Sequence, residues 1–293
     1  MRHSTALRAR LGGPEIIVLP GAYDALSARL AQQAGFDAVF TTGFGFSAAA
    51  LGAPDYGLLT ASEVLDRVRP IVAAVDVPLV ADMDTGYGNP LNVVRTVREC
   101  VSAGVAGIIL EDQEWPKKCG HFEGKRVIPA EEQVQKLHAA VDARGDDDLV
   151  IIGRTDARAP LGLDEAIRRG RLYHEAGADV VFVEAPQSID ELKAVREAIP
   201  DAPLFANMIE GGKTPLLSTT ELQDLGYGMV VFPLAALFSA AKAVAATFRA
   251  LHDEKTTASR VDALTGFHEF EQIVGAPDWH ELEARYGVTE GAA

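Results

Sequence analysis

Acidic side chains follow several short apolar runs of this sequence, at the point where each run ends. Asp82 and Asp84 come after one run, Glu111 follows the next run and Glu184 a later one. Residues two apart on a strand point to the same side, so Asp82 and Asp84 can face one cavity. Buried carboxylates need a cation or hydrogen bonds. All-oxygen ligands favour Mg²⁺ or Mn²⁺ over zinc, so we expect a divalent metal site. A metal-free cluster that shares protons or pairs with arginine is the alternative.

An arginine and an amide end two further runs of the same kind. Arg154 follows residues 149–152, and Asn207 follows residues 203–206. The planar guanidinium of Arg154 matches the geometry of a carboxylate, so we expect it to anchor a carboxylate of the substrate. An ion pair with Glu184 or Asp82 is its alternative role.

A cysteine lies in a basic loop after the fourth apolar run. In the segment WPKKCGH, residues 115–121, Cys119 has two lysines and a histidine as neighbours. Positive neighbours favour the thiolate, and Gly120 gives the loop room to hinge. We therefore expect a reactive thiol on a gating loop, with an ordinary exposed thiol as the alternative. Cys100, within a helical stretch, is expected to be structural.

The elements that must position these residues alternate along the chain. Four helical stretches end in a glycine, as at Ala34-Gly35 and Ala103-Gly104, and an apolar run follows almost at once. Three more apolar runs follow helical stretches without that glycine, and one begins the series. Such runs are typical of buried parallel strands, which need crossover connections. Eight of them predict a closed (β/α)8 barrel, with an open doubly wound sheet as the alternative. The eight expected strands cover residues 16–19, 37–41, 78–81, 106–110, 149–152, 179–183, 203–206 and 229–232.

The 293 residues are expected to form one catalytic barrel over residues 1–251 and a helical tail over residues 252–293. The tail carries aromatic residues among charged ones, so we expect short helices that dock on the barrel or on another subunit.

The charge of the chain limits its partners. Lys and Arg number 27 and Asp and Glu 42, which gives a net charge of −15. Such a surface disfavours nucleic acid and anionic membranes. Two cysteines make no disulfide framework, no signal peptide is evident, and the apolar stretch 229–241 is too short to span a bilayer. We therefore expect a soluble, cytoplasmic protein.

Together these motifs resemble the isocitrate lyase and phosphoenolpyruvate mutase superfamily, especially its branch of small lyases. The cysteine loop combined with the paired aspartates is the most specific part, and the likeness covers about residues 20–251. The resemblance is carried by Pro20–Asp24, Gly52–Asp55, Asp82–Gly88, Glu111–Gln113, Lys117–His121, Gly153–Asp156 and residues 207–215.

The resemblance implies a metal and an assembly. Asp82 would contact Mg²⁺ (or Mn²⁺) directly, and Asp55, Asp84 and Glu111 would hold it through water. Members are typically homotetramers that exchange the eighth barrel helix between subunits, which would give the tail a partner.

The resemblance also implies roles in catalysis and binding. Cys119 would be the catalytic acid or base on a gating loop, Arg154 would anchor the substrate carboxylate, and Glu184 would act beside them. The backbone of Thr42 and Gly43 would contact the pyruvyl end. The other substrate-binding positions implied are Phe44, Lys117, His121, Asn207 and Thr214.

The implied activity is Mg²⁺-dependent cleavage of a carbon–carbon bond in a 2-hydroxy di- or tricarboxylate through an enolate, with pyruvate or a related keto acid as product. Methylisocitrate lyases carry a tyrosine, leucine, serine and three glycines where this chain has Phe40–Gly45. The bulky Phe44 favours a smaller dicarboxylate such as a 2-alkylmalate. Alternatives on the same scaffold are a carboxyphosphonoenolpyruvate phosphonomutase and an oxaloacetate decarboxylase or phosphonopyruvate hydrolase. A metabolite-binding protein without catalysis is a third possibility.

Overall fold

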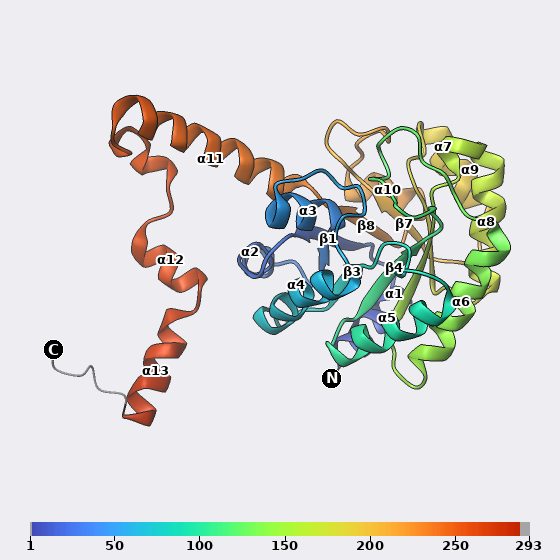
Figure 1. Ribbon diagram of the computed structural model, residues 1–293, viewed down its shortest axis with the longest axis horizontal. Coiled ribbons are helices and arrows are strands. Elements are labelled where there is room, and N and C mark those ends of the chain that lie inside the picture. Colours follow the sequence, from blue (N-terminus) through green and yellow to red (C-terminus); the bar gives the residue numbers. More distant parts are fainter. Residues whose placement is uncertain (1, 288–293) are drawn as a thin grey trace. The chain divides into compact units, whose positions relative to one another are not determined.

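The computed structural model describes residues 2–287 and contains a closed barrel of eight parallel strands (Figure 1). Each strand pairs with its neighbour in sequence, and β1 closes the ring against β8, where Ile17 lies opposite Met229. The closed barrel is therefore confirmed, and the open sheet is excluded. The strands are β1 (Ile17–Ala22), β2 (Val39–Thr41), β3 (Leu79–Asp82), β4 (Gly107–Glu111), β5 (Val150–Thr155), β6 (Val180–Val183), β7 (Leu204–Asn207) and β8 (Met229–Phe232).

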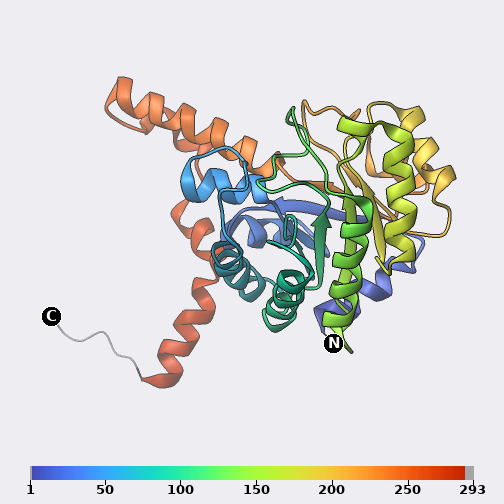
Figure 2. The same ribbon diagram turned by 45° about the vertical axis from the view of Figure 1, so that its right-hand side comes forward.

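Helices connect the strands and flank them on the outside of the barrel (Figures 1 and 2). Their ends are encoded locally: Asn89 caps α5 through the amides of Leu91 and Asn92, and Gly104 beyond its end has φ 80°. The connecting helices are α2 (Ala25–Gln33), α3 (Gly43–Leu51), α4 (Ala61–Ala74), α5 (Pro90–Ser102), α6 (Ala130–Arg144), α7 (Arg158–Leu161), α8 (Leu163–Glu175), α9 (Ile189–Ala198) and α10 (Thr219–Asp224).

The barrel is filled by side chains and closed at one end. Leu19, Ile109, Phe205 and Met229 belong to the interior cluster, and each is almost completely buried. Leu7, from α1 (His3–Leu11), packs into the same cluster from the N-terminal ends of the strands. Only the C-terminal ends of the strands are thus free to form a site, as in other barrels of this type.

The chain divides into two compact units, the first ending at Leu237 and the second beginning at Phe238. Most of α11 (Ala235–Glu254) belongs to the second unit, whereas the sequence places the boundary after residue 251. The second unit also contains η1 (Ala258–Ala263), α12 (Phe267–Ile273) and α13 (Ala276–Tyr286). Among the described residues, we find no helix with the length and apolar character that a bilayer span requires.

Candidate active site

A small cavity of about 40 Å³ lies at the C-terminal ends of the strands. One part of its wall is polar and carries loop residues 117–121, and another part is aromatic and aliphatic. Phe182 and Phe205 pack there with ring centroids 4.8 Å apart. The lining residues are Phe40, Thr42, Phe44, Asp55, Asp82, Lys117, Cys119, Gly120, His121, Arg154, Phe182, Phe205, Asn207, Ile209, Val231, Pro233 and Leu234.

Asp82 and Asp84 lie side by side at the end of β3. The Asp82 carboxylate accepts hydrogen bonds from the amides of Gly43 (3.3 Å) and Asp84 (3.1 Å). Asp84 has φ 49°, a conformation that non-glycine residues rarely adopt. Burial raises the pKa of Asp84 to about 6, against the nearby charge of Lys117. The strand end therefore concentrates negative charge at some energetic cost.

Lys117 reaches from the loop into this acidic group. Its Nζ lies 2.8 Å from Oδ2 of Asp55 and 2.6 Å from Oδ1 of Asp84. Although burial opposes it, the charges of Asp84 and Asp55 hold the pKa of Lys117 well above its ordinary value. Lys117 is thus a fixed cation of the cluster as well as part of the cavity wall.

Glu111, at the end of β4, is almost fully buried and only partly compensated. Its Oε2 lies 3.3 Å from Nε of Arg154, whereas its Oε1 is buried without a hydrogen-bond partner. Burial raises the pKa of Glu111 well above its ordinary value, although Arg154 opposes this. An orphaned buried carboxylate oxygen calls for a proton, a water molecule or a cation.

The acidic residues have the chemistry of a magnesium site, although their arrangement is not that of a preformed one. Within residues 2–287, no three His, Cys, Asp or Glu side chains converge closely enough to hold a metal ion. Asp82, however, forms no ion pair in the described chain, and Glu111 Oε1 has no partner. Hard oxygen donors with an uncompensated negative charge suit Mg²⁺ that keeps several of its waters. The acidic residues therefore fit a bound Mg²⁺ ion.

Arg154, on β5, is fixed from several sides. Its Nε and Nη2 donate to the two oxygens of Asp156 over 2.8 and 3.1 Å, and its Nη2 lies 3.5 Å from Oε2 of Glu184. Its guanidinium also stacks over the Phe182 ring at 5.0 Å. Arg154 therefore contacts Glu184, as one alternative expected, and it also lines the cavity, while its role as a substrate anchor stays a prediction.

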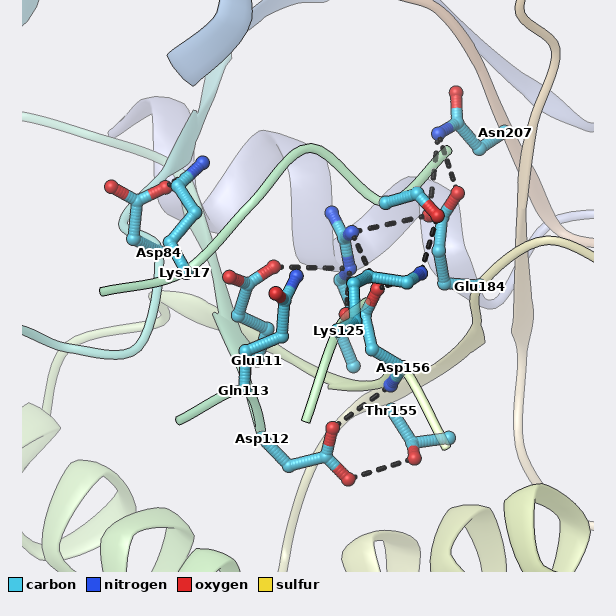
Figure 3. A network of polar contacts seen from close by, with 12 residues as sticks. Asp84, Glu111, Asp112, Gln113, Lys117, Lys125, Thr155, Asp156, Glu184 and Asn207 are labelled. Atoms are coloured by element: carbon cyan, nitrogen blue, oxygen red, sulfur yellow. Dashed lines mark hydrogen bonds and ion pairs between the residues drawn. The ribbon is translucent and has the colours of Figure 1, made fainter. Parts of the chain in front are cut away.

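Glu184, after β6, has no solvent exposure and is a hydrogen-bonded carboxylate. His121 Nε2 lies 2.9 Å from its Oε1. Asn207 Nδ2 donates to both oxygens over 3.3 Å (Figure 3). Although burial raises it, the charge of Arg154 and the bond from His121 hold the pKa of Glu184 below its ordinary value. Glu184 is therefore anionic at neutral pH.

Cys119 is buried against the barrel mouth, which excludes an exposed surface thiol. Its amide donates to the carbonyl of Asp55 over 3.1 Å. Burial raises the pKa of Cys119 to about 11, so the expectation of a favoured thiolate is wrong. The reason is that Lys117 is engaged by Asp55 and Asp84 and His121 by Glu184, which leaves little charge to stabilise the thiolate. A neutral thiol beside a cavity is a proton donor.

The sequence matches the phosphoenolpyruvate phosphomutase family over residues 7–252, which cover the whole barrel. The chain belongs to this family. Among its curated relatives, 2,3-dimethylmalate lyase of Eubacterium barkeri is 47% identical over 98% of this chain and 99% of its own length.

Solved structures of the family superpose closely on this chain. Oxaloacetate acetylhydrolase in complex with 3,3-difluorooxalacetate has a TM-score of 0.93 at 37% identity, covering 98% of this chain and 97% of its own. Phosphonopyruvate hydrolase in complex with oxalate and Mg²⁺ has a TM-score of 0.88 at 33% identity, covering 98% and 99%. The family thus contains proteins named for several reactions of small keto and hydroxy acids.

The family fold brings most of the predicted site residues together. Gly43 and Glu184 lie directly behind the cavity wall, because a Cβ on Gly43 would stand 3.2 Å from Asp84 Oδ1 and Glu184 contacts His121. Asp84 and Glu111 also lie outside the lining, but they contact the lining residues Lys117 and Arg154. Thr214 does not line the cavity either; it is buried, and its Oγ1 has no hydrogen-bond partner. The individual roles of these residues remain predictions.

Two charged residues of the site had no role assigned from the sequence. Asp156 holds Arg154, and Lys125 holds Asp156 with Nζ and Oδ1 2.8 Å apart. The signal for Asp156 was present, because it lies two residues after Arg154 on the same side of the chain. Lys125 gave no such signal, since nothing in its local sequence shows that a loop lysine folds inward.

Proposed function

We propose that this protein, an enzyme of the carbon–carbon lyase class, cleaves a 2-hydroxy dicarboxylate to pyruvate or a related keto acid with the help of Mg²⁺. The observation that carries the proposal is the neutral, buried thiol of Cys119, which shares one cavity with Arg154 and Asp82. A proton donor, a carboxylate anchor and a cluster of hard oxygen ligands are the groups that such a cleavage needs.

The chemistry balances without a further reactant. The 2-hydroxyl group loses its proton and becomes the keto oxygen as the C2–C3 bond breaks. The electron pair of that bond moves to C3, where the adjacent carboxylate delocalises it as an enolate. Cys119 then gives its proton to C3, and the hydroxyl proton, taken up by the anionic carboxylate of Glu184 as the bond breaks, is returned to the thiolate. The two products contain all atoms of the substrate, so no water is consumed.

In this proposal, three residues of the chain bind the substrate or transfer protons: Arg154, Glu184 and Cys119. Arg154 binds a substrate carboxylate and is held in its orientation by Asp156. Glu184, an anionic carboxylate whose Oε1 lies 2.9 Å from His121 Nε2, stands directly behind the polar wall of the cavity. The loop that carries Cys119 covers the mouth, so water does not compete with the thiol for the carbanion.

Magnesium, when bound, would neutralise the negative charge that develops on the reacting oxygens. Asp82 is the direct ligand in this proposal, and Asp55, Asp84 and Glu111 hold the ion through water. Support comes from the Asp82 carboxylate, which accepts two amide hydrogen bonds but forms no ion pair in the described chain, from the orphaned Glu111 oxygen, and from the phosphonopyruvate hydrolase relative that binds Mg²⁺ with oxalate.

The cavity supports a small substrate with an apolar substituent. Phe40 and Phe205 lie on the same wall with centroids 6.4 Å apart, and Phe44 adds a third ring. These rings offer no hydrogen-bond donor to a third carboxylate. We therefore favour a 2-alkylmalate, in agreement with the relative named 2,3-dimethylmalate lyase. The small volume equally suits an unsubstituted acid such as oxaloacetate, on which one structural relative acts.

A substrate panel tests the proposal. Purified enzyme with Mg²⁺ is given 2,3-dimethylmalate, methylisocitrate, oxaloacetate and a phosphonopyruvate, and keto acid release is followed with a coupled reductase. Phosphorus resonances are recorded in parallel. We expect the alkylmalate to be cleaved faster than methylisocitrate, without phosphorus rearrangement. A faster reaction with methylisocitrate would reject the steric argument, and a rearranged phosphonate would make the enzyme a mutase.

We further propose a cytoplasmic homotetramer that exchanges α11 between subunits and binds neither nucleic acid nor membranes. No residue of α11 is buried, and this includes large apolar side chains: Val244, Phe248 and Leu251 are 48%, 64% and 44% exposed. Such apolar side chains on a charged surface suit a subunit interface. Light scattering coupled to gel filtration tests this: four times the chain mass of 31.2 kDa supports it, and a monomer contradicts it.

A further inference from the structure

Lys125 is a buried lysine at the base of the loop that carries Cys119. Only 1% of its side chain is exposed, and its Nζ donates to Oδ1 of Asp156 over 2.8 Å and also to the carbonyl oxygen of Gly120. Loop lysines are normally solvated, because burying an ammonium group costs several kcal/mol unless it is paired and hydrogen-bonded. The position of Lys125 inside the site therefore requires an explanation.

The base of the loop is anchored independently of Lys125. Gln113 and Val127 form an antiparallel bridge, and the amide of Glu114 donates to the carbonyl of Arg126 over 2.9 Å. The segment between them, residues 115–125, folds over the barrel mouth. Lys125 stands just inside this anchor, so its backbone is fixed while its side chain reaches back to the loop tip at Gly120.

The other partner of Lys125 orients the substrate anchor. Asp156 receives two hydrogen bonds from Arg154 and one from Lys125, and all three side chains are buried (Figure 3). The loop tip and Arg154 are also in direct contact, because a Cβ on Gly120 would stand 2.5 Å from Nη2 of Arg154. One ammonium group thus joins the carbonyl of the loop tip to the carboxylate that holds the guanidinium.

We propose that Lys125 is a positioning residue that couples the closed position of the loop to the orientation of Arg154. The inference rests on the proposed function, in which Arg154 binds a substrate carboxylate and Cys119 is delivered by the loop. Without the ammonium group, the carbonyl of Gly120 loses its buried donor and Asp156 keeps only Arg154 as a charged partner. The loop tip is then released, and Arg154 is no longer held in one orientation.

Two measurements on Lys125→Met test the coupling, and neither needs turnover. The first is calorimetric binding of oxalate in the presence of Mg²⁺, which reports on Arg154. The second is the rate at which iodoacetamide alkylates Cys119, which reports on loop release. Lys118→Met is the matched control, because Lys118 belongs to the same loop and its Nζ has exposed partners, the carbonyls of Glu123 and Gly124 and, at 6.0 Å, the ring of Tyr56.

We expect Lys125→Met to bind oxalate about 10²-fold more weakly, as for a misplaced anchoring group, and to alkylate at least tenfold faster. Lys118→Met should match the wild type in both. In turnover, KM should rise and kcat should fall together, and Lys125→Arg should recover part of both because it restores a buried donor. If Lys125→Met does not fold, Lys125→Gln, which keeps one donor, is measured in its place, with smaller changes in the same directions.

The inference is overturned if a folded Lys125 variant binds oxalate and alkylates like the wild type. It is also overturned if only one of the two properties changes, because the coupling requires both. Failure of the proposed function is a separate result, because it is measured by cleavage in the substrate panel. Oxalate affinity and the alkylation rate of Cys119 can be compared between Lys125→Met and the wild type even if no hydroxy acid is cleaved.

Discussion

The Cα of Gly120 lies so close to Arg154 that a methyl group on it would stand 2.5 Å from Nη2 of the arginine. Real Cβ contacts essentially never approach this distance, and Glu184 would be met at 2.7 Å on the same side. Gly120→Ala should therefore prevent the loop from closing over the cavity. We expect a loss of about 10²-fold in kcat/KM, the usual penalty for misplaced catalytic groups.

A glycine without close neighbours is the control for that variant. Gly12 has φ −84°, and its nearest contact is a carbonyl 3.8 Å away, so Gly12→Ala should leave kcat/KM unchanged. Full activity of Gly120→Ala would show that the loop does not have to adopt this position during turnover.

Cys119→Ser should bind oxalate and Mg²⁺ normally but lose cleavage. A serine hydroxyl keeps the shape of the side chain yet is a far weaker acid, and loss of a positioned general acid costs on the order of 10²–10⁴ in rate. Steady-state keto acid release measures the effect. Cys100→Ala, at a buried position of helix α5, should retain the wild-type rate. Equal turnover by Cys119→Ser would exclude the thiol as proton donor.

Thiol reactivity should depend steeply on pH. With the pKa of Cys119 raised to about 11 by burial, the reactive thiolate is a small fraction at neutral pH and grows about tenfold per pH unit below that pKa. Alkylation rates measured from pH 7 to 10 should thus rise without a plateau. In Cys119→Ser the remaining thiol is that of Cys100, and burial raises its pKa to about 12. This variant should therefore be alkylated much more slowly than the wild type. A plateau near pH 8 would mean that the thiolate is stabilised after all.

The buried carboxylate of Asp112 holds neighbouring parts of the site through hydrogen bonds. Asp112 accepts hydrogen bonds from Tyr173 Oη (2.6 Å), Thr155 Oγ1 (2.8 Å) and the amide of Asp156 (2.8 Å). Tyr173→Phe removes one donor from this buried charge and should lower the free energy of unfolding by about 1–3 kcal/mol. Urea unfolding measures the change.

Tyr227→Phe is the comparison for this variant. Its hydroxyl donates to a neutral carbonyl, that of Leu192, over 3.2 Å. A neutral hydrogen bond contributes about 0.5–1.5 kcal/mol, so Tyr227→Phe should cost less than Tyr173→Phe. An equal or larger loss for Tyr227→Phe would show that the Asp112 network adds nothing beyond an ordinary buried hydrogen bond.

Strand positions and barrel closure could be predicted from the sequence because both depend on local signals. The apolar runs, and the glycine that ends the helix before four of them, are local features of the sequence. The strand β8 begins and ends where expected, at Met229 and Phe232. The clustering of the residues at the strand ends could be predicted from the same pattern, since parallel strands in a barrel bring their C-terminal ends to one place. The convergence of Asp82, Glu111 and Arg154 could therefore be expected.

The chemistry of the loop could not be predicted in this way. The ionisation of Cys119 depends on which acids occupy Lys117 and His121, and those partners, such as Asp55 and Glu184, are far away in sequence. The inward fold of Lys125 likewise depends on Asp156, on a different strand connection. Adjacent positive residues in a sequence indicate a charge, but the fold decides what that charge stabilises.

The dependence of cleavage on magnesium tests the proposed reaction most directly. The enzyme is stripped with a chelator, and keto acid release from 2,3-dimethylmalate is measured as free Mg²⁺ is restored, in the wild type and in Asp82→Asn. We predict that the stripped wild type is inactive and recovers fully with Mg²⁺, whereas Asp82→Asn needs a far higher concentration. Cleavage at the full rate by the stripped enzyme would contradict a role for the acidic cluster as a metal site.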